Sequence, residues 1–120
     1  MIESEKIGLI RTVFYTEEFK VFYLSLNNKA QSKIDYIIAL IKDFRLIHTD
    51  FVKKLIGTEF YEMRISIGKN EYRTIIFSID HDNIIEATEI VLLNGFLKKS
   101  TKDYKAQIKI AEKILKNIEL

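Results

Sequence analysis

The feature that most constrains the fold is a change of hydrophobic period near the middle of the chain. Between residues 30 and 44 apolar side chains recur every three or four positions, which is the period of an amphipathic helix. Between residues 61 and 67 apolar and polar side chains alternate, which is the period of a strand with one buried face. The chain must therefore combine a long helix with a sheet.

Shorter signals extend this pattern in both directions. Thr16 is placed to cap a first helix, and Asn27 or Asn28 to cap the second, which ends near Leu46. We expect strands over residues 9–15, 61–67, 72–79 and 84–93, with short turns that require antiparallel pairing within the meander. The closing helix has an apolar stripe of Tyr104, Ile108, Ala111, Leu115 and Ile118. The predicted class is α+β, a small twisted antiparallel sheet with an N-terminal helical hairpin and a C-terminal helix, the helices lying against one face.

Composition is that of an ordinary globular domain. The 120 residues are 48% hydrophobic and 30% charged and include no cysteine, which excludes a disulfide framework and a thiolate metal site. We expect one domain over residues 1–120. No apolar stretch is long enough to span a membrane, and the N-terminus lacks the basic start and apolar run of a signal peptide. The expected location is the cytoplasm.

Positive charge is concentrated near the C-terminus. Residues 96–120 hold seven lysines and three acidic residues, a net charge of +4, whereas residues 1–95 carry a net charge of −2. Opposite signs in the two parts favour a face that binds an anion. A solvated lysine-rich helix explains the same residues without a ligand.

Arg64 and Arg73 are candidates for anion binding, because they lie on neighbouring predicted strands joined by a tight turn. Across such a hairpin two guanidiniums can clamp one phosphate with paired donors. The alternative is a cross-strand charge cluster of Glu62, Arg64 and Glu71 that only keeps the sheet soluble. Arg73 favours a function, because it stands among apolar residues where a long cation needs a partner.

A second group of candidates follows the last predicted strand. Lys98, Lys99 and Lys102 stand where we expect the strand to give way to the closing helix, a region that can expose backbone amides to phosphate. Tyr104 heads that helix, and nearby lysines can favour its ionised form for proton transfer. A solvated loop and a packed tyrosine explain the same residues.

The two histidines give no sign of a metal centre. His48 follows the long helix and His81 lies in a predicted turn between two aspartates. Metal sites need several ligands at suitable spacing, so we expect neither a metal nor a cofactor.

Several short segments occur in a recognisable order. They are LIG at residues 55–57, YEMR at 61–64, YR at 72–73 and LLNGFLKKSTK at 92–102, followed by a helix containing Ala111. This series resembles the HigB-like branch of the RelE toxins, which are components of bacterial type II toxin–antitoxin pairs, and above all a phage-derived subgroup. The resemblance runs from about residue 16 to the C-terminus.

The resemblance implies an activity and its residues. Family members cleave mRNA in the ribosomal A site without a metal, and the expected nucleophile is the 2′-hydroxyl of the RNA. They are silenced by a helix-turn-helix antitoxin, here expected to be HigA-like, through which alone they contact operator DNA. The positions implied for catalysis are Arg64, Arg73, Lys98 and Tyr104. Those implied for RNA binding are Lys53, Lys54, Lys99 and Lys102.

Two positions depart from the family pattern. Asn94 stands where the HigB-like branch usually has histidine, and Asp103-Tyr104 replaces a segment that usually carries proline. Because Asn94 removes a proton-transfer group, one alternative is a catalytically degenerate module that only binds an antitoxin. Another is a ParE-like toxin that inhibits DNA gyrase, although such a protein needs no phosphate clamp.

Overall fold

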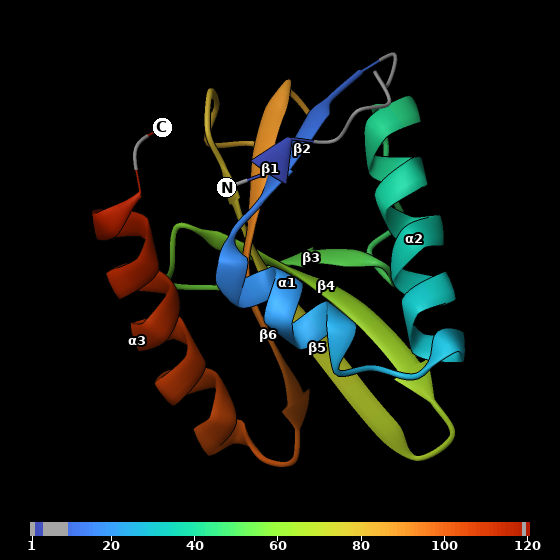
Figure 1. Ribbon diagram of the computed structural model, residues 1–120. Coiled ribbons are helices and arrows are strands. Elements are labelled where there is room, and N and C mark those ends of the chain that lie inside the picture. The colour runs from blue at the N-terminus through green and yellow to red at the C-terminus, as the bar shows by residue number, and fades with distance from the viewer. Residues whose placement is uncertain (1, 4–9, 119) are drawn as a thin grey trace.

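The computed structural model describes residues 2–3, 10–118 and 120, and Figure 1 shows its helices and strands. The first part of the chain forms β1 (Ile2–Glu3), β2 (Thr12–Tyr15), α1 (Glu17–Leu24) and α2 (Asn28–Asp43). The second part forms β3 (Val52–Lys54), β4 (Phe60–Ile67), β5 (Asn70–Ser78), β6 (Glu89–Lys98) and α3 (Thr101–Asn117). The α+β class is confirmed. Leu9, the expected start of the first strand, lies outside the described residues.

The two helices of the N-terminal hairpin begin at the predicted caps. The Thr16 hydroxyl accepts the amide N–H of Phe19, and the Asn27 side-chain oxygen accepts that of Ala30. Each cap satisfies one amide that the first turn of the helix leaves without a partner. The second helix ends at Asp43, three residues before the expected Leu46.

The strands form one six-stranded sheet in the order β1-β2-β6-β5-β4-β3. Strands β3 to β6 pair antiparallel, as the short turns predict. The first strand differs from expectation, because β2 pairs parallel with β6. Both helices and the meander separate these two strands along the chain, and so long a connection allows parallel pairing.

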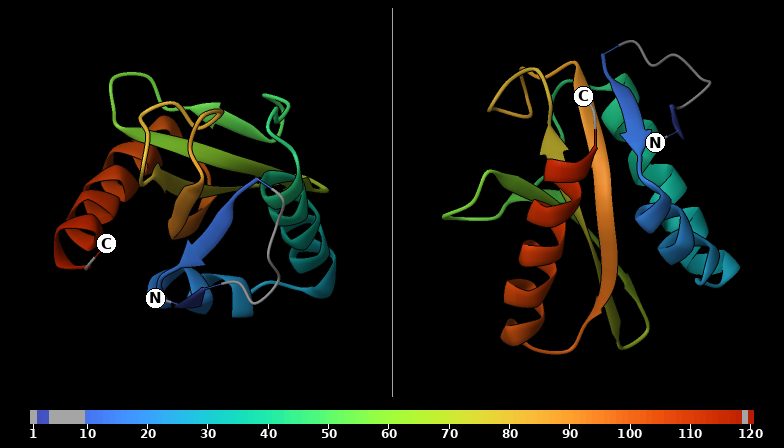
Figure 2. Two further views of the ribbon diagram at one scale, coloured as in Figure 1. Left: turned by 90° about the horizontal axis from the view of Figure 1, so that it is seen from above. Right: turned by 60° about the vertical axis from the view of Figure 1, so that its left-hand side comes forward.

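The helices cover both faces of the sheet, so the expectation that they lie against one face was wrong. One core packs α1 and α2 on residues such as Met63, Ile76 and Leu92. A second core packs α3 on residues of the opposite face, among them Ile75, Val91 and Leu93. Figure 2 shows α3 on the side of the sheet away from α2. The central strands are apolar on both faces, and this pattern permits a helix on either side.

The last strand is displaced toward the C-terminus relative to its prediction at residues 84–93. Residues 84–87 form a turn that buries Ile84 and Ala87, and the Asp80 carboxylate accepts the amides of Thr88 and Glu89. The strand then continues to Lys98. The strand was expected to end at residue 93, so that prediction was too short and left Lys98 outside the strand. Gly95 lies within the strand, and a Cβ there would lie 2.2 Å from the Phe22 ring, so glycine allows α1 to pack on β6 at this point.

Candidate active site

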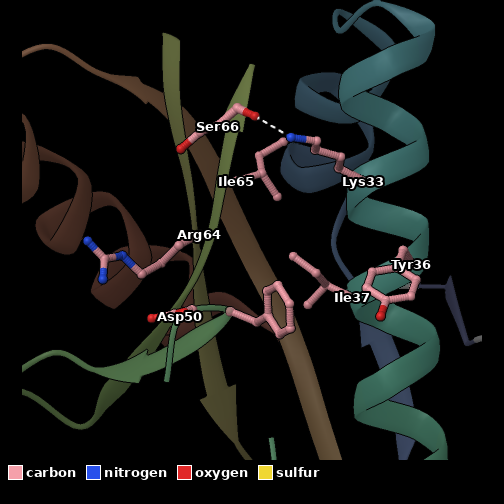
Figure 3. Close-up of a pocket in the computed structure, with 8 residues that line it drawn as sticks. Lys33, Tyr36, Ile37, Asp50, Arg64, Ile65 and Ser66 are labelled. Carbon is pink, nitrogen blue, oxygen red and sulfur yellow. Dashed lines mark hydrogen bonds between the residues drawn. The ribbon is translucent and has the colours of Figure 1, made fainter. Parts of the chain in front are cut away.

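The register of the meander brings the two candidate arginines together. Arg64 on β4 pairs directly with Arg73 on β5, and Arg73 pairs with Phe96 on β6. In the neighbouring row Glu62 pairs with Ile75. Since partners across a ladder share one face, these side chains lie on the face that α3 covers. Figure 3 shows Arg64 projecting to one side of the sheet and Ile65 projecting toward α2.

A β-bulge in β6 places Lys98 on the same face. Ile76 pairs with Leu92 and Ile75 with Asn94, so Leu93 is the extra residue. An extra residue reverses the alternation of all positions after it. Without the bulge Lys98 would point to the side of α1 and α2. With the bulge it pairs with Glu71, and its ammonium lies 5.7 Å from the centre of the Tyr104 ring.

Arg73 is the most buried residue of this group, with only 2% of its side chain exposed. Its Nε donates to the Tyr104 hydroxyl at 2.9 Å and lies 3.0 Å from a carboxylate oxygen of Glu62. Its terminal nitrogens donate to the Tyr72 carbonyl and to the Glu71 carboxylate at 3.3 Å. Each nitrogen of this guanidinium therefore has a partner within the protein.

Glu62 is the acceptor around which the cluster is built. One of its oxygens accepts the Tyr104 hydroxyl at 2.7 Å and lies 3.6 Å from Arg64 Nε. The predicted charge cluster thus exists, but it is centred on a buried carboxylate and includes both arginines and a phenol. Sequence reasoning treated Glu62 only as a solubilising residue. The available signal was its alternation with Met63, which places the carboxylate beside Arg64 on the covered face.

Tyr104 retains its proton more strongly than a free tyrosine. Burial and the hydrogen bond to Glu62 raise its pKa, and Arg73 opposes this effect. The expectation that nearby lysines favour the ionised phenol was therefore wrong. At neutral pH this side chain is a proton donor, and its hydroxyl also accepts from Arg73.

The cations differ in how far solvent can reach them. The Arg64 side chain is 34% exposed, and Lys98 is half-buried. Arg64 and Lys98 flank the buried pair of Arg73 and Glu62 on the same face. Arg64 and Lys98 therefore supply accessible positive charge directly beside the buried pair.

The two lysines of β3 do not act together. Lys53 pairs with Glu62 and so lies on the face of the cluster. Lys54 pairs with Tyr61 on the other face, where its ammonium lies 5.2 Å from the Tyr61 ring centre and donates to the Thr58 carbonyl. The structure therefore separates Lys54 from the other proposed RNA contacts.

Backbone amides at the start of α3 donate to a side chain of the same helix. The Asp103 carboxylate accepts the backbone amides of Lys99 and Ser100, at 2.6 and 2.7 Å. These bonds lower the pKa of Asp103. We expected phosphate to bind backbone amides in this region. These two amides are instead bonded to Asp103 in a capping box. Lys99 and Lys102 remain exposed beside it.

Asn94 lies under α3 rather than at the surface. It is 4% exposed, and its amide nitrogen donates to the Gln107 side chain at 2.9 Å. Its side-chain oxygen has no hydrogen-bond partner among the described residues. At this position the residue anchors α3 to β6.

A hollow of about 320 Å³ lies between α2 and the edge of β4 and is lined by Lys33, Tyr36 and Arg64 among others (Figure 3). Lys33 donates to the Ser66 carbonyl on that edge. In the described part of the chain no three histidine, aspartate or glutamate side chains gather as a metal site would require. None of the described helices could cross a membrane.

Comparison with known proteins identifies a family and a fold. The family model described as "Phage derived protein Gp49-like (DUF891)" matches residues 22–116. The structure is similar to that of a mutant of the E. coli toxin RelE in the free state, with a TM-score of 0.59 and 14% identity, over 84% of this chain and 97% of that one. It is also similar to a chain of the intact E. coli RelBE toxin–antitoxin complex, with a TM-score of 0.50 and 13% identity, over 73% and 96% of the two chains. No curated protein sequence matches. The fold is therefore RelE-like, as expected.

Proposed function

The chain belongs to the family of phage-derived Gp49-like proteins, and from that premise we propose that it is the toxin of a toxin–antitoxin pair, an endoribonuclease that cleaves mRNA on the ribosome. The observation that carries the proposal is the cluster on the α3 face. There, accessible cations flank a phenol hydrogen-bonded to both a buried carboxylate and a buried guanidinium. The HigB-like resemblance and the RelE-like fold support the same activity.

Positive charge in the cluster suits a reaction at phosphorus. When the 2′-hydroxyl attacks the adjacent phosphorus, negative charge grows on the phosphoryl oxygens. Arg64 and Lys98 are accessible enough to contact those oxygens. Arg73 adds a donor if the half-exposed Glu71 carboxylate gives up its place to the phosphate. The products are a 2′,3′-cyclic phosphate and a free 5′-hydroxyl.

Tyr104 and Glu62 can carry out the two proton transfers that this reaction requires. Glu62 accepts the proton of the attacking 2′-hydroxyl, and neutral Tyr104 donates its proton to the departing 5′-oxygen. The resulting phenolate lies beside Arg73, which stabilises it. Because the two oxygens are 2.7 Å apart, the proton on Glu62 can then pass to Tyr104. This transfer restores the resting state.

The test is primer extension on an mRNA during translation, with purified protein added. We expect discrete cuts that Arg64→Gln weakens about a hundredfold, the usual effect of removing one transition-state donor, and that Tyr104→Phe weakens by a similar factor. Matched controls are Arg45→Gln and Tyr23→Phe, which change the same residue types outside the cluster. The proposal is wrong if both cluster variants cut as well as their controls.

The proposed partner is a helix-turn-helix antitoxin of the HigA type. The antitoxin would also be the part of the toxin–antitoxin complex that binds operator DNA. One of the similar structures is a RelBE toxin–antitoxin complex, which supports a protein inhibitor for this chain too. Such a pair would act in the cytoplasm, where mRNA is translated. A small helix-turn-helix reading frame beside this gene, and co-purification of its product, would test the assignment.

A second candidate function is an antitoxin-binding module without nuclease activity. It is favoured by Arg73, all of whose nitrogens already have partners within the protein. Induced expression without the antitoxin distinguishes the two functions. Growth arrest with cut mRNA supports the nuclease, whereas normal growth supports the module. Arrest with intact mRNA and inhibited DNA supercoiling would indicate a ParE-like toxin.

A further inference from the structure

The outward side of α3 carries a straight row of lysines that the proposed reaction does not use. We call it the lysine ridge, and its members are Lys102, Lys105, Lys109, Lys113 and Lys116. All five are exposed. In Figure 2 no other helix or strand of the described residues covers the outer side of α3.

The spacing of the ridge residues aligns them along the helix. They follow one another at intervals of three, four, four and three residues, which at about 100° per residue keeps them within an arc of about 80°. Ala111 and Ile114, which pack on the sheet, lie on the opposite side of the helix. At about 1.5 Å per residue the ridge is about 21 Å long. It is therefore a rigid linear array of ammonium groups.

Stability of the helix does not explain this arrangement. Among the described residues none of the five lysines forms an ion pair with a carboxylate. Like charges three or four positions apart destabilise a helix, and in this row only Glu112, three positions after Lys109 and four before Lys116, offsets that repulsion. Lys102 lies in the first turn, where the helix dipole disfavours a cation. The acidic residue of that turn, Asp103, is turned to the backbone amides instead.

We propose that the lysine ridge binds the phosphate backbone of double-stranded RNA, such as the helices of ribosomal RNA. This inference rests on the proposed function, which brings the protein to the ribosome. A rigid row of cations suits a rigid duplex, because neither partner has to be ordered on binding. Lys99 is exposed just before the N-terminal end of the ridge, whereas Lys98 lies against the Tyr104 ring on the sheet side of α3.

The composition of the ridge favours duplex RNA over other polyanions. Proteins that bind single-stranded RNA stack its bases on exposed aromatic rings, but the one aromatic residue of α3, Tyr104, faces the sheet. Protein interfaces are depleted in lysine and rely on buried aromatic or apolar anchors. Apart from the exposed carboxylate of Glu112 at its side, the ridge offers ammonium groups, which contact phosphates irrespective of sequence.

The experiment measures binding of a labelled 20-base-pair RNA duplex by fluorescence anisotropy over a series of salt concentrations. The test variant combines Lys105→Gln, Lys109→Gln and Lys113→Gln. Its matched control combines Lys20→Gln, Lys29→Gln and Lys69→Gln, which removes the same charge elsewhere. We expect the ridge variant to bind at least tenfold more weakly and the slope of log affinity against log salt to fall by about 2, since each phosphate contact contributes about 0.7 to 0.9.

The inference is overturned if both variants lose affinity equally, or if the ridge variant binds like the unchanged protein. It is also overturned if poly-glutamate competes as well as duplex RNA, because the ridge would then suit an acidic protein. The same variants are assayed for mRNA cleavage, together with Arg64→Gln. Ridge-dependent duplex binding without any cleavage would refute the proposed nuclease alone. Cleavage without ridge-dependent binding would refute the ridge alone.

Discussion

The buried pair of Glu62 and Arg73 allows the sharpest test of the cluster. Their side chains are 8% and 2% exposed, and the closest atoms are 3.0 Å apart. Removing one partner of a buried ion pair leaves an uncompensated charge and costs about 3–5 kcal/mol. Glu62→Gln should cost about 3 kcal/mol, at the low end of this range, because Arg73 keeps Glu71 at 3.3 Å.

The second perturbation removes the other partner. In Arg73→Met, Glu62 keeps the hydrogen bond from Tyr104, but the nearest cation left to it is the partly exposed Arg64 at 3.6 Å, so we expect a cost of about 4 kcal/mol. When Glu62→Met and Arg73→Met are combined, no buried charge is left without a partner. The double variant should therefore be more stable than Arg73→Met alone, although its RNA cleavage is lost.

The assay is urea unfolding followed by circular dichroism, with stability taken from the midpoint at constant slope. The diagnostic quantity is the coupling energy in the cycle of Glu62→Met, Arg73→Met and the double variant, expected to be about 3 kcal/mol. If the costs of the two single variants simply add in the double variant, the two charges do not act as a unit. The description of the cluster as a buried ion pair would then be wrong.

Three further predictions concern single side chains. Because the pKa of Tyr104 is raised by burial and by its hydrogen bond to a carboxylate, its contribution to stability is complete below about pH 10 and is lost as pH rises through the raised pKa. Tyr104→Phe should reduce that loss in unfolding measured between pH 9 and 12, and Tyr15→Phe, which changes a tyrosine outside the cluster, serves as the control. Arg11 is 1% exposed and donates to carbonyls in α2 and the 84–85 turn, so Arg11→Met should cost about 4 kcal/mol in urea unfolding; a cost below about 1 kcal/mol would contradict this role. Gly95→Ala should cost about 1–3 kcal/mol because its Cβ meets the Phe22 ring, and Phe22→Leu should recover part of that cost if the clash is its cause.

Local sequence patterns were sufficient for much of the fold. The caps of α1 and α2, the alternation along β4 and the tight turn after it follow from interactions between residues close in sequence. The same turn placed Arg64 opposite Arg73, so part of the site was predictable as well. The last strand was expected to end at residue 93, but it continues past Gly95, which makes room for a ring from α1.

The centre of the site could not be predicted from local patterns. The alternation of β4 put Glu62 on the face of Arg64, but the role of Glu62 depends on its hydrogen bond from Tyr104, 42 positions away in the chain. Lys98 reaches this face only because β6 contains a bulge. An apolar run such as Ile90 to Leu93 does not specify which of its two faces a helix will cover.

The amino-acid sequence by itself determined the three helices, the four longer strands and their order, the hairpin that pairs the two arginines and the row of lysines along α3, because each depends on spacing within one segment. The short strands β1 and β3 were not predicted. Tertiary structure decided that α3 covers the face opposite α1 and α2, and that a phenol, a carboxylate and a guanidinium meet beneath it. The physical reason is that packing and charge pairing act through space. Side chains remote in sequence therefore set each other's burial and protonation.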